Sequence, residues 1–201
     1  MFDEKYVTNE LSRYRKKGPG DTTRLLIEAL KKEGVQGLTL LDIGGGVGAI
    51  QHGLLEAGAV QAIDVDASSA YLSAARVEAQ RRGYTDRIRF QQGDFVDLAA
   101  NITPADIVTL DRVICCYPDM EKMVGLSVAR TWKIYGMVIP RESWWVKIGL
   151  GVGNFFFRLR RNPFRTYVHP IRAVEAILSS NGFKRHSYRK TFIWQVAVYT
   201  R

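Results

Sequence analysis

The residues best suited to chemistry lie in one short stretch, Leu40 to Gly48, which reads Leu-Leu-Asp-Ile-Gly-Gly-Gly-Val-Gly. An apolar strand is predicted to end there in an acid, Asp42, and a turn rich in glycine follows. Glycine lacks a Cβ atom, so such a turn can be tight and can let a ligand approach the backbone closely. The carboxylate of Asp42 could meet a polar or cationic group of that ligand. We therefore expect a nucleoside-containing cofactor that carries positive charge rather than a bare pyrophosphate.

Further carboxylates follow at the spacing of a dinucleotide-type site. The pattern Gly44-x-Gly46-x-x-Ala49 precedes Asp64 and Asp66, which close a second apolar run about twenty residues further on. A carboxylate at that edge of an open sheet can accept hydrogen bonds from both ribose hydroxyl groups. The spacing to the next helix favours Asp66, with Asp64 as the alternative.

The third and fourth apolar runs also end in residues that could contact a nucleoside. Gly93, Asp94 and Phe95 follow the third run. There a carboxylate could accept a hydrogen bond from an adenine amino group while the aromatic ring covers the base. Asp111 and Arg112 end the fourth run and are expected at the same edge of the sheet.

Strands and helices that alternate along the chain would bring these side chains together. The spacing of apolar residues predicts strands at 38–43, 59–65, 88–92, 106–110 and 135–139, the fourth with a possible extension to 114. It predicts helices at 21–32, 49–57, 68–82, 118–132 and 170–180. The tail, 183–199, reads as two strands joined without a helix, so they must pair antiparallel.

This order predicts a single α/β domain over residues 1–201. We expect a doubly wound, mostly parallel seven-stranded sheet with an antiparallel last strand and helices on both faces. Residues 1–20 are interpreted as an N-terminal lid over the cofactor. The segment 141–168 fits no sheet unit, and its aromatic residues predict a helical cap between the fifth strand and the last helix.

The cap is where we expect an acceptor molecule to bind. Trp144 and Trp145 could form the apolar wall of a substrate pocket, but for any single aromatic residue of the cap core packing is the favoured explanation. Arg141 could bind a substrate carboxylate or phosphate, as could Arg112, Arg158 and Arg165. Tyr117 joins Trp144, Trp145 and Arg141 as the four candidate substrate residues. The stretch 148–161 also fits an amphipathic surface helix, so peripheral contact with a membrane is a further interpretation.

Composition limits the class of partner. The chain has a formal charge of +9 and a pI of about 9.7, which favours anionic partners such as nucleic acid, anionic lipid or an acidic small substrate. A solvated basic face is the alternative interpretation. The two cysteines, Cys115 and Cys116, are adjacent and indicate neither a disulfide framework nor a zinc site, so we expect no metal and a reducing, cytoplasmic setting. The sequence shows no signal peptide, and it predicts no particular oligomeric state.

Four stretches taken together resemble the class I, Rossmann-like family of S-adenosylmethionine-dependent methyltransferases: LLDIGGGVG, AIDVDASSAYLSAAR, FQQGDF and DIVTLDRV. The resemblance covers about residues 21–140 and the final hairpin. It implies S-adenosylmethionine as cofactor. The residues that it implies for cofactor binding are Asp42, Gly44, Gly45, Gly46, Gly48, Asp64, Asp66, Gly93, Asp94, Phe95, Asp111 and Arg112. The Tyr14…Thr22-Thr23 segment, the Cys-Tyr-Pro turn and the cap are similar to the Mg-protoporphyrin and small-metabolite O-methyltransferase branch.

The resemblance implies in-line methyl transfer to oxygen or nitrogen of a small metabolite that is anionic or aromatic and apolar. A hydroxyl or amine acceptor would need a general base, whereas a carboxylate would not. The candidate bases are His169, Tyr14 and Asp111. Two alternatives are an NAD-dependent oxidoreductase, although the chain lacks a Tyr-x-x-x-Lys pair, and an RNA methyltransferase, although it lacks an Asn/Asp-Pro-Pro-aromatic motif.

Overall fold

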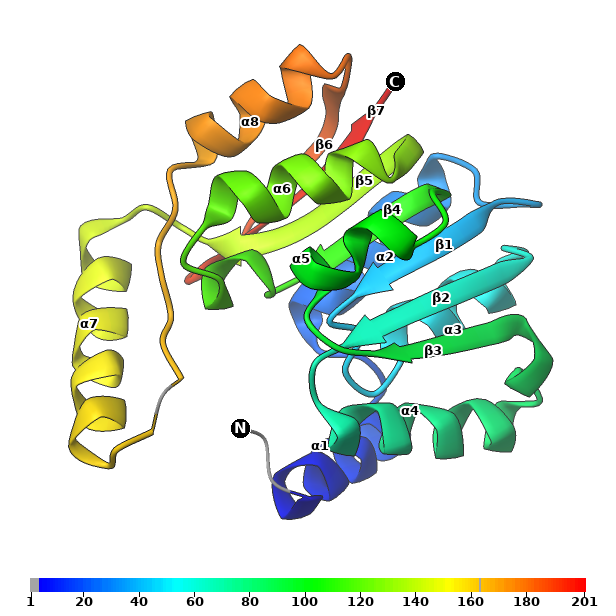
Figure 1. Cartoon of the computed structure of the whole chain (residues 1–201), viewed down its shortest axis with the longest axis horizontal. Coiled ribbons are helices and arrows are strands. Elements are labelled where there is room, and N and C mark those ends of the chain that lie inside the picture. Colours follow the sequence, from blue (N-terminus) through cyan, green and yellow to red (C-terminus); the bar gives the residue numbers. More distant parts are fainter. Residues whose placement is uncertain (1–3, 163) are drawn as a thin grey trace.

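A seven-stranded sheet forms the centre of the computed structural model, which describes residues 4–162 and 164–201 (Figure 1). The strand order is β3-β2-β1-β4-β5-β7-β6, and β7 alone runs antiparallel to its neighbours. This architecture confirms the predicted fold class. The strands are β1 (Thr39–Ile43), β2 (Gln61–Asp66), β3 (Ile88–Gln92), β4 (Ala105–Asp111), β5 (Thr131–Pro140), β6 (Lys184–Lys190) and β7 (Trp194–Thr200).

Helices cover both faces of the sheet because each central strand is apolar on both sides. Along β1, Leu41 and Ile43 pack into one core with α5, α6 and α8, whereas Leu40 packs into the other with α2, α3 and α4. This alternation is the two-residue period of a strand. The helices are α1 (Glu4–Lys17), α2 (Asp21–Lys32), α3 (Ala49–Glu56), α4 (Ser69–Arg82), α5 (Phe95–Leu98), α6 (Met120–Ala129), α7 (Trp144–Leu159) and α8 (Ile171–Ser180).

Two element boundaries differ from the prediction. β4 ends at Asp111, and Ile114 belongs to a short 3-10 turn instead of an extension of the strand. The helix expected to reach Trp132 ends at Ala129, and β5 begins at Thr131, which pairs with Ala105 of β4. The local apolar pattern fits either a longer α6 or a longer β5. Pairing with β4 therefore sets the boundary between these two elements.

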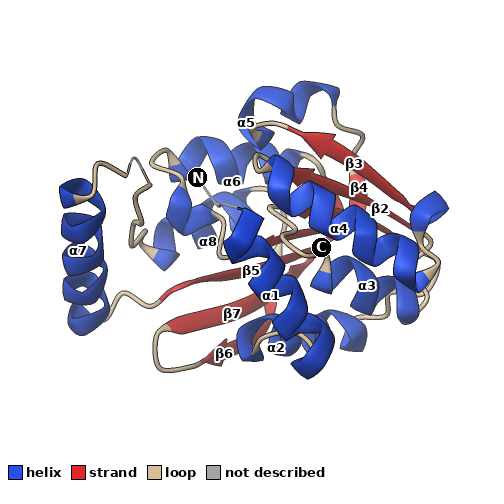
Figure 2. Ribbon diagram, turned by 90° about the horizontal axis from the view of Figure 1, so that it is seen from below, coloured by secondary structure: helices blue, strands red, loops and turns tan. Residues whose placement is uncertain are grey.

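Two helices lie outside the main layers. α1 packs against α4 through a small core of its own that contains Val7, Leu11 and Tyr14. α7 stands apart from the sheet in two perpendicular views (Figures 1 and 2). No helix in the described part of the chain is both long and apolar enough to cross a membrane.

Candidate cofactor and acceptor site

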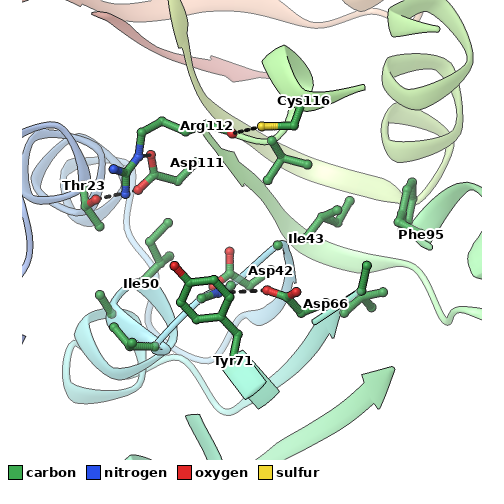
Figure 3. Close-up of a pocket in the computed structure, with 18 of the residues that line it drawn as sticks. Thr23, Asp42, Ile43, Ile50, Asp66, Tyr71, Phe95, Asp111, Arg112 and Cys116 are labelled. Atoms are coloured by element: carbon green, nitrogen blue, oxygen red, sulfur yellow. Dashed lines mark hydrogen bonds and ion pairs between the residues drawn. The ribbon is translucent and has the colours of Figure 1, made fainter. Parts of the chain in front are cut away.

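A cavity of about 650 Å³ opens where β1, β2 and β4 end, beneath α1. Asp42, Asp66 and Asp111, one from each of these strands, line it (Figure 3). In an open α/β sheet, ligands bind at the carboxyl ends of the strands, where the strand order reverses. The sequence pattern predicted these acids at one edge of the sheet, and the structure places them around one cavity.

The glycine turn after β1 forms one wall of the cavity. Gly46 has a φ of 59°, and a Cβ atom built on it would meet no heavy atom closer than 3.9 Å, so its backbone faces open space. Gly45 faces the protein interior instead, where a Cβ atom would lie 2.3 Å from Gln51 Nε2 and 2.6 Å from Asp64 Oδ1. The turn therefore needs glycine at one position for its backbone angles and at the other for close packing.

Asp66 joins the end of β2 to the glycine turn. Its Oδ2 accepts a hydrogen bond from the Gly46 N–H at 3.3 Å, and its Oδ1 accepts one from the Ser68 N–H at 2.8 Å. Burial raises the pKa of this carboxyl, and the two backbone hydrogen bonds oppose that rise. The carboxylate is thus held at the cavity wall in a fixed orientation.

A buried pair of acids lies beneath the turn. Asp42 Oδ1 accepts a hydrogen bond from the Thr109 hydroxyl at 2.7 Å, and Oδ2 accepts one from Gln51 Nε2 at 3.2 Å. Burial raises the pKa of Asp42 to about 7. Asp64, its register partner on β2, is completely buried, and among the described residues neither of its oxygens has a hydrogen-bond partner. Burial, and then the charge of Asp42, raise the pKa of Asp64 well above its ordinary value.

The sequence pattern allows Asp64 as an alternative to Asp66 for contact with a ribose, but the buried Asp64 does not reach the cavity. It lies behind Gly45 and is not among the residues that line the cavity, whereas Asp66 is. Gly48 is likewise absent from the lining. It is the last residue before α3, and a Cβ atom built on it would point at His52.

The loop after β3 closes another side of the cavity. Asp94 Oδ1 accepts a hydrogen bond from the Val96 N–H at 2.8 Å and so begins the short helix α5. Gly93, Asp94 and the buried Phe95 all line the cavity. The sequence predicted these three residues as neighbours of the ligand, but not the helix that they start.

Asp111 and Arg112 lie at the end of β4 (Figure 3). Asp111 Oδ2 accepts a hydrogen bond from the Thr23 hydroxyl at 2.5 Å, and Oδ1 accepts one from Arg112 Nε at 3.0 Å. Burial lowers the pKa of Arg112, but the charge and hydrogen bond of Asp111 outweigh that effect and raise it. Arg112 also has a φ of 61°, a strained value for a residue with a side chain. Such strain is common at functional sites.

The three candidate bases occupy different surroundings. Tyr14 lines the cavity, its hydroxyl lies 3.3 Å from His52 Nδ1, and burial raises its pKa, so the phenol stays protonated at neutral pH. Asp111 lines the cavity with both oxygens hydrogen-bonded. His169 does not line it, and its Nε2 lies 2.9 Å from the backbone oxygen of Tyr117.

The start of the cap, where substrate-binding residues were expected, does not line the cavity. Arg141 donates to the backbone oxygen of Thr191 at 3.1 Å and lies over the ring of Trp145, so neither side chain reaches the cavity. Trp144 is 70% exposed and also lies outside it. Of the four candidate substrate residues, only Tyr117 lines the cavity.

The cavity wall on the cap side comes from the segment that returns from α7 to α8. Phe164, Arg165 and Tyr167 line the cavity there, and Glu10 and Arg13 line it from α1. Of these five residues the sequence indicated only Arg165, as a candidate to bind a substrate carboxylate or phosphate. Nothing in the spacing of the other four separates them from surface residues. The described residues contain no group of three or more His, Cys, Asp or Glu side chains that could hold a metal ion.

The fold is a Rossmann-like α/β sheet, and its cavity opens beside the glycine turn at the carboxyl ends of the strands. A family model described as "Methyltransferase domain" matches residues 35–145, and the chain belongs to this family, the class I S-adenosylmethionine-dependent methyltransferases. Family membership excludes the oxidoreductase alternative.

Individual relatives agree with this assignment. A ribosomal protein L11 methyltransferase from Serratia proteamaculans is 31% identical over 117 residues, which make up 55% of this chain and 40% of that protein. The match thus spans less than half of that relative's length.

Two solved structures share the fold. A magnesium protoporphyrin IX methyltransferase from Synechocystis PCC 6803, crystallised with bound SAH, has a TM-score of 0.72 and 20% identity, covering 98% of this chain and 96% of that one. An O-methyltransferase family protein from Burkholderia thailandensis has a TM-score of 0.74 and 14% identity, covering 99% of this chain and 60% of that one.

Proposed function

We propose that this chain transfers the methyl group of S-adenosylmethionine to a carboxylate oxygen of a small acceptor with an aromatic or apolar body. The observation that carries this proposal is the composition of the cavity. Beside five carboxyl groups, the lining contains three arginines and several aromatic rings, and among the described residues it includes no histidine and no lysine.

The residues present fit the cofactor. The open backbone at Gly46 leaves space for a ligand that a larger residue would fill. We propose that Asp66 binds the ribose hydroxyl groups, that Asp94 and Phe95 hold the adenine, and that Asp42 faces the cationic end of the methionine part. When bound, S-adenosylmethionine supplies a methyl group on a positively charged sulfur. The chain's task is then to orient an acceptor and to exclude water.

Arginine and aromatic side chains suit an acid with an apolar body. Arg112 uses its Nε for Asp111, and a guanidinium has further N–H donors that can bind a carboxylate. Arg13 from α1, which lies 3.8 Å from Glu10, and Arg165 from the return segment, which donates to the backbone oxygens of Asn162 and Phe164, are the other two cations of the lining. Tyr117 and Tyr167 offer ring surface beside them.

A carboxylate acceptor also accounts for the state of the candidate bases. None of the three candidate bases is well placed to remove a proton from an acceptor. The Tyr14 phenol is protonated, Asp111 has both oxygens hydrogen-bonded, and His169 is not among the residues that line the cavity. A carboxylate is already ionised at neutral pH and needs no base. The roles of Asp111 and Arg112 in this proposal are to hold the acceptor in line with the methyl group. Residues 1–20 act as the lid, of which 4–20 are described, and 141–168 act as the cap, of which 163 lies outside the described residues.

The test is a methyl-transfer assay with labelled S-adenosylmethionine and three acceptor sets: aromatic carboxylic acids, phenols of matched shape, and RNA. We expect label in the acids, released as methanol by mild alkali because the product is an ester. Arg112→Lys and Arg165→Gln should raise the KM for the acid about tenfold or more without loss of cofactor binding. An alkali-stable product, or label in RNA that depends steeply on salt, would contradict the proposal.

A further inference from the structure

α7 presents a continuous apolar stripe to solvent. The stripe recurs at three- and four-residue spacing, so it occupies one side of the helix. Every member is at least half exposed, from 51% at Val152 to 70% at Trp144. The apolar stripe consists of Trp144, Ile148, Val152, Phe155, Phe156 and Leu159. Exposed apolar area of this extent normally marks a binding surface.

The stripe is not the side of α7 that packs onto the protein. Asn154, on the other side, donates from Nδ2 to the Thr166 backbone oxygen at 2.7 Å, and its Oδ1 accepts from the Thr166 N–H at 2.9 Å. The rings of Phe157 and Phe164 meet edge to face with centroids 5.5 Å apart. Val146, on the same side, is buried. These contacts fix the rotation of the helix, so the apolar stripe must face outward.

The turn between β6 and β7 extends this surface. Phe192 at the turn is 75% exposed and stacks on Trp145 with ring centroids 6.3 Å apart, and Ile193 beside it is 41% exposed. Arg141 holds the turn to the start of α7 through the backbone oxygens of Thr191 and Phe192. The apolar stripe and the turn therefore form one surface on a fixed frame.

The stretch of sequence that contains α7 and the return segment carries only positive charge. From residue 143 to residue 174 the sequence contains no aspartate and no glutamate. The same stretch contains Lys147, Arg158, Arg160, Arg161, Arg165 and Arg172. A symmetric contact with a second copy would bring the same basic residues face to face, which is unfavourable. An anionic, apolar surface complements both properties at once.

We propose that α7 and the β6–β7 turn dock on an anionic lipid bilayer, with α7 lying in the plane of the interface. Trp144 at one end would sit at the headgroup level, the phenylalanines would enter the acyl boundary, and the arginines would meet lipid phosphates. The return segment, which Thr166 joins to α7, lines the cavity through Arg165 and Tyr167. Docking would thus bring the acceptor end of the cavity next to the bilayer.

Flotation of the full chain with vesicles tests this proposal. We expect the protein to float with vesicles of phosphatidylcholine containing about one-quarter phosphatidylglycerol, and not with phosphatidylcholine alone. The double variant Phe155→Ser, Phe156→Ser should lower the bound fraction about tenfold or more. A matched variant, Val60→Ser with Val77→Ser, removes two other exposed apolar side chains and should float as the wild type does.

Two double charge-reversal variants test whether the basic residues of α7 bind anionic lipid. Arg158→Glu with Arg160→Glu should abolish flotation, whereas Lys122→Glu with Lys184→Glu, an equal change of charge elsewhere, should reduce it only slightly. Circular dichroism and thermal unfolding establish that each variant folds. Equal binding to neutral vesicles, or flotation that the stripe variant leaves intact, would overturn the proposal. So would a dimer in light scattering that only the stripe variant dissociates, because the stripe would then be a contact between copies.

Discussion

A methyl group added at Gly45 would overlap two buried polar side chains. An alanine there would place its Cβ 2.3 Å from Gln51 Nε2 and 2.6 Å from Asp64 Oδ1, and both of these side chains are completely buried. We expect Gly45→Ala to lower the free energy of unfolding by about 1–3 kcal/mol, because overpacking a buried site displaces its neighbours. Cofactor binding should weaken as the turn shifts. Urea unfolding and calorimetric titration with S-adenosylmethionine measure the two effects.

Gly125 on α6 provides the matched control. A Cβ atom there meets no other atom within 4 Å, and alanine is favoured over glycine inside a helix. Gly125→Ala should therefore leave cofactor binding unchanged and slightly raise stability. Equal behaviour of the two variants would show that the polar cluster beneath the turn is not packed as described.

Asp66 and Asp64 differ in what they can contact, although they lie two residues apart on one strand. Asp66 lines the cavity and Asp64 does not. We expect Asp66→Asn to weaken the binding of S-adenosylmethionine about tenfold or more, because an amide accepts fewer hydrogen bonds from a ribose diol. Asp64→Asn should change this affinity much less. Calorimetry measures the affinity of both variants for S-adenosylmethionine. A larger loss of affinity in Asp64→Asn than in Asp66→Asn would mean that Asp64 is the ribose ligand.

At the scale of elements, α1 is held on α4 by a buried carboxylate. Glu78 of α4 accepts hydrogen bonds from Arg15 Nε at 2.8 Å, Arg81 at 2.5 Å and Arg82 at 2.8 Å. Burial alone would raise the pKa of Glu78, but these hydrogen bonds outweigh it and hold the pKa well below its usual range. We expect Glu78→Gln to cost about 2 kcal/mol or more, since the arginines lose their charged partner.

The same variant should also weaken cofactor binding, because α1 brings Glu10, Arg13 and Tyr14 to the cavity. Glu121→Gln on the surface of α6 is the control and should change neither property. Thermal unfolding and calorimetry measure both. Undiminished cofactor binding in a destabilised Glu78→Gln protein would argue against α1 as a lid.

The sequence predicts well those elements whose formation depends on residues close together in the chain. The five parallel strands follow from runs of apolar residues, and the turn at Gly46 follows from the need for a positive φ. The inward position of Asp64 has no such local signal, because alternation assigns it to the same face as Asp66. In the structure Asp64 lies beside the buried Asp42 on β1, two residues before the end of β2, where Asp66 reaches the cavity. The cap shows the same limit, since α7 has apolar residues on both sides and tertiary contacts of Asn154, Phe157 and Val146 decide which side faces out.

The pH dependence of stability is a property of the whole molecule to which buried groups contribute with opposite signs. Asp42, with a pKa near 7, and Asp64 hold protons in the folded state that the unfolded chain has released above about pH 4. They therefore stabilise the fold at low pH, and this contribution is lost as the pH rises toward 7. His52 acts in the opposite direction. Burial lowers its pKa to about 4, so its contribution is lost as the pH falls below about 6.5.

The difference in the free energy of unfolding between Asp64→Asn and the wild type isolates the contribution of the buried acids. We expect the advantage of Asp64→Asn over the wild type to be larger at pH 8 than at pH 5, because the folded wild type keeps a proton on Asp64 that the unfolded chain has released. Its advantage in the free energy of unfolding should grow by up to roughly 1.4 kcal/mol per pH unit for each proton involved. Urea unfolding between pH 5 and 8 measures this slope. Asp97→Asn, at an exposed position on α5, should give no such trend. A constant difference between Asp64→Asn and the wild type would mean that the buried pair holds no proton in this range.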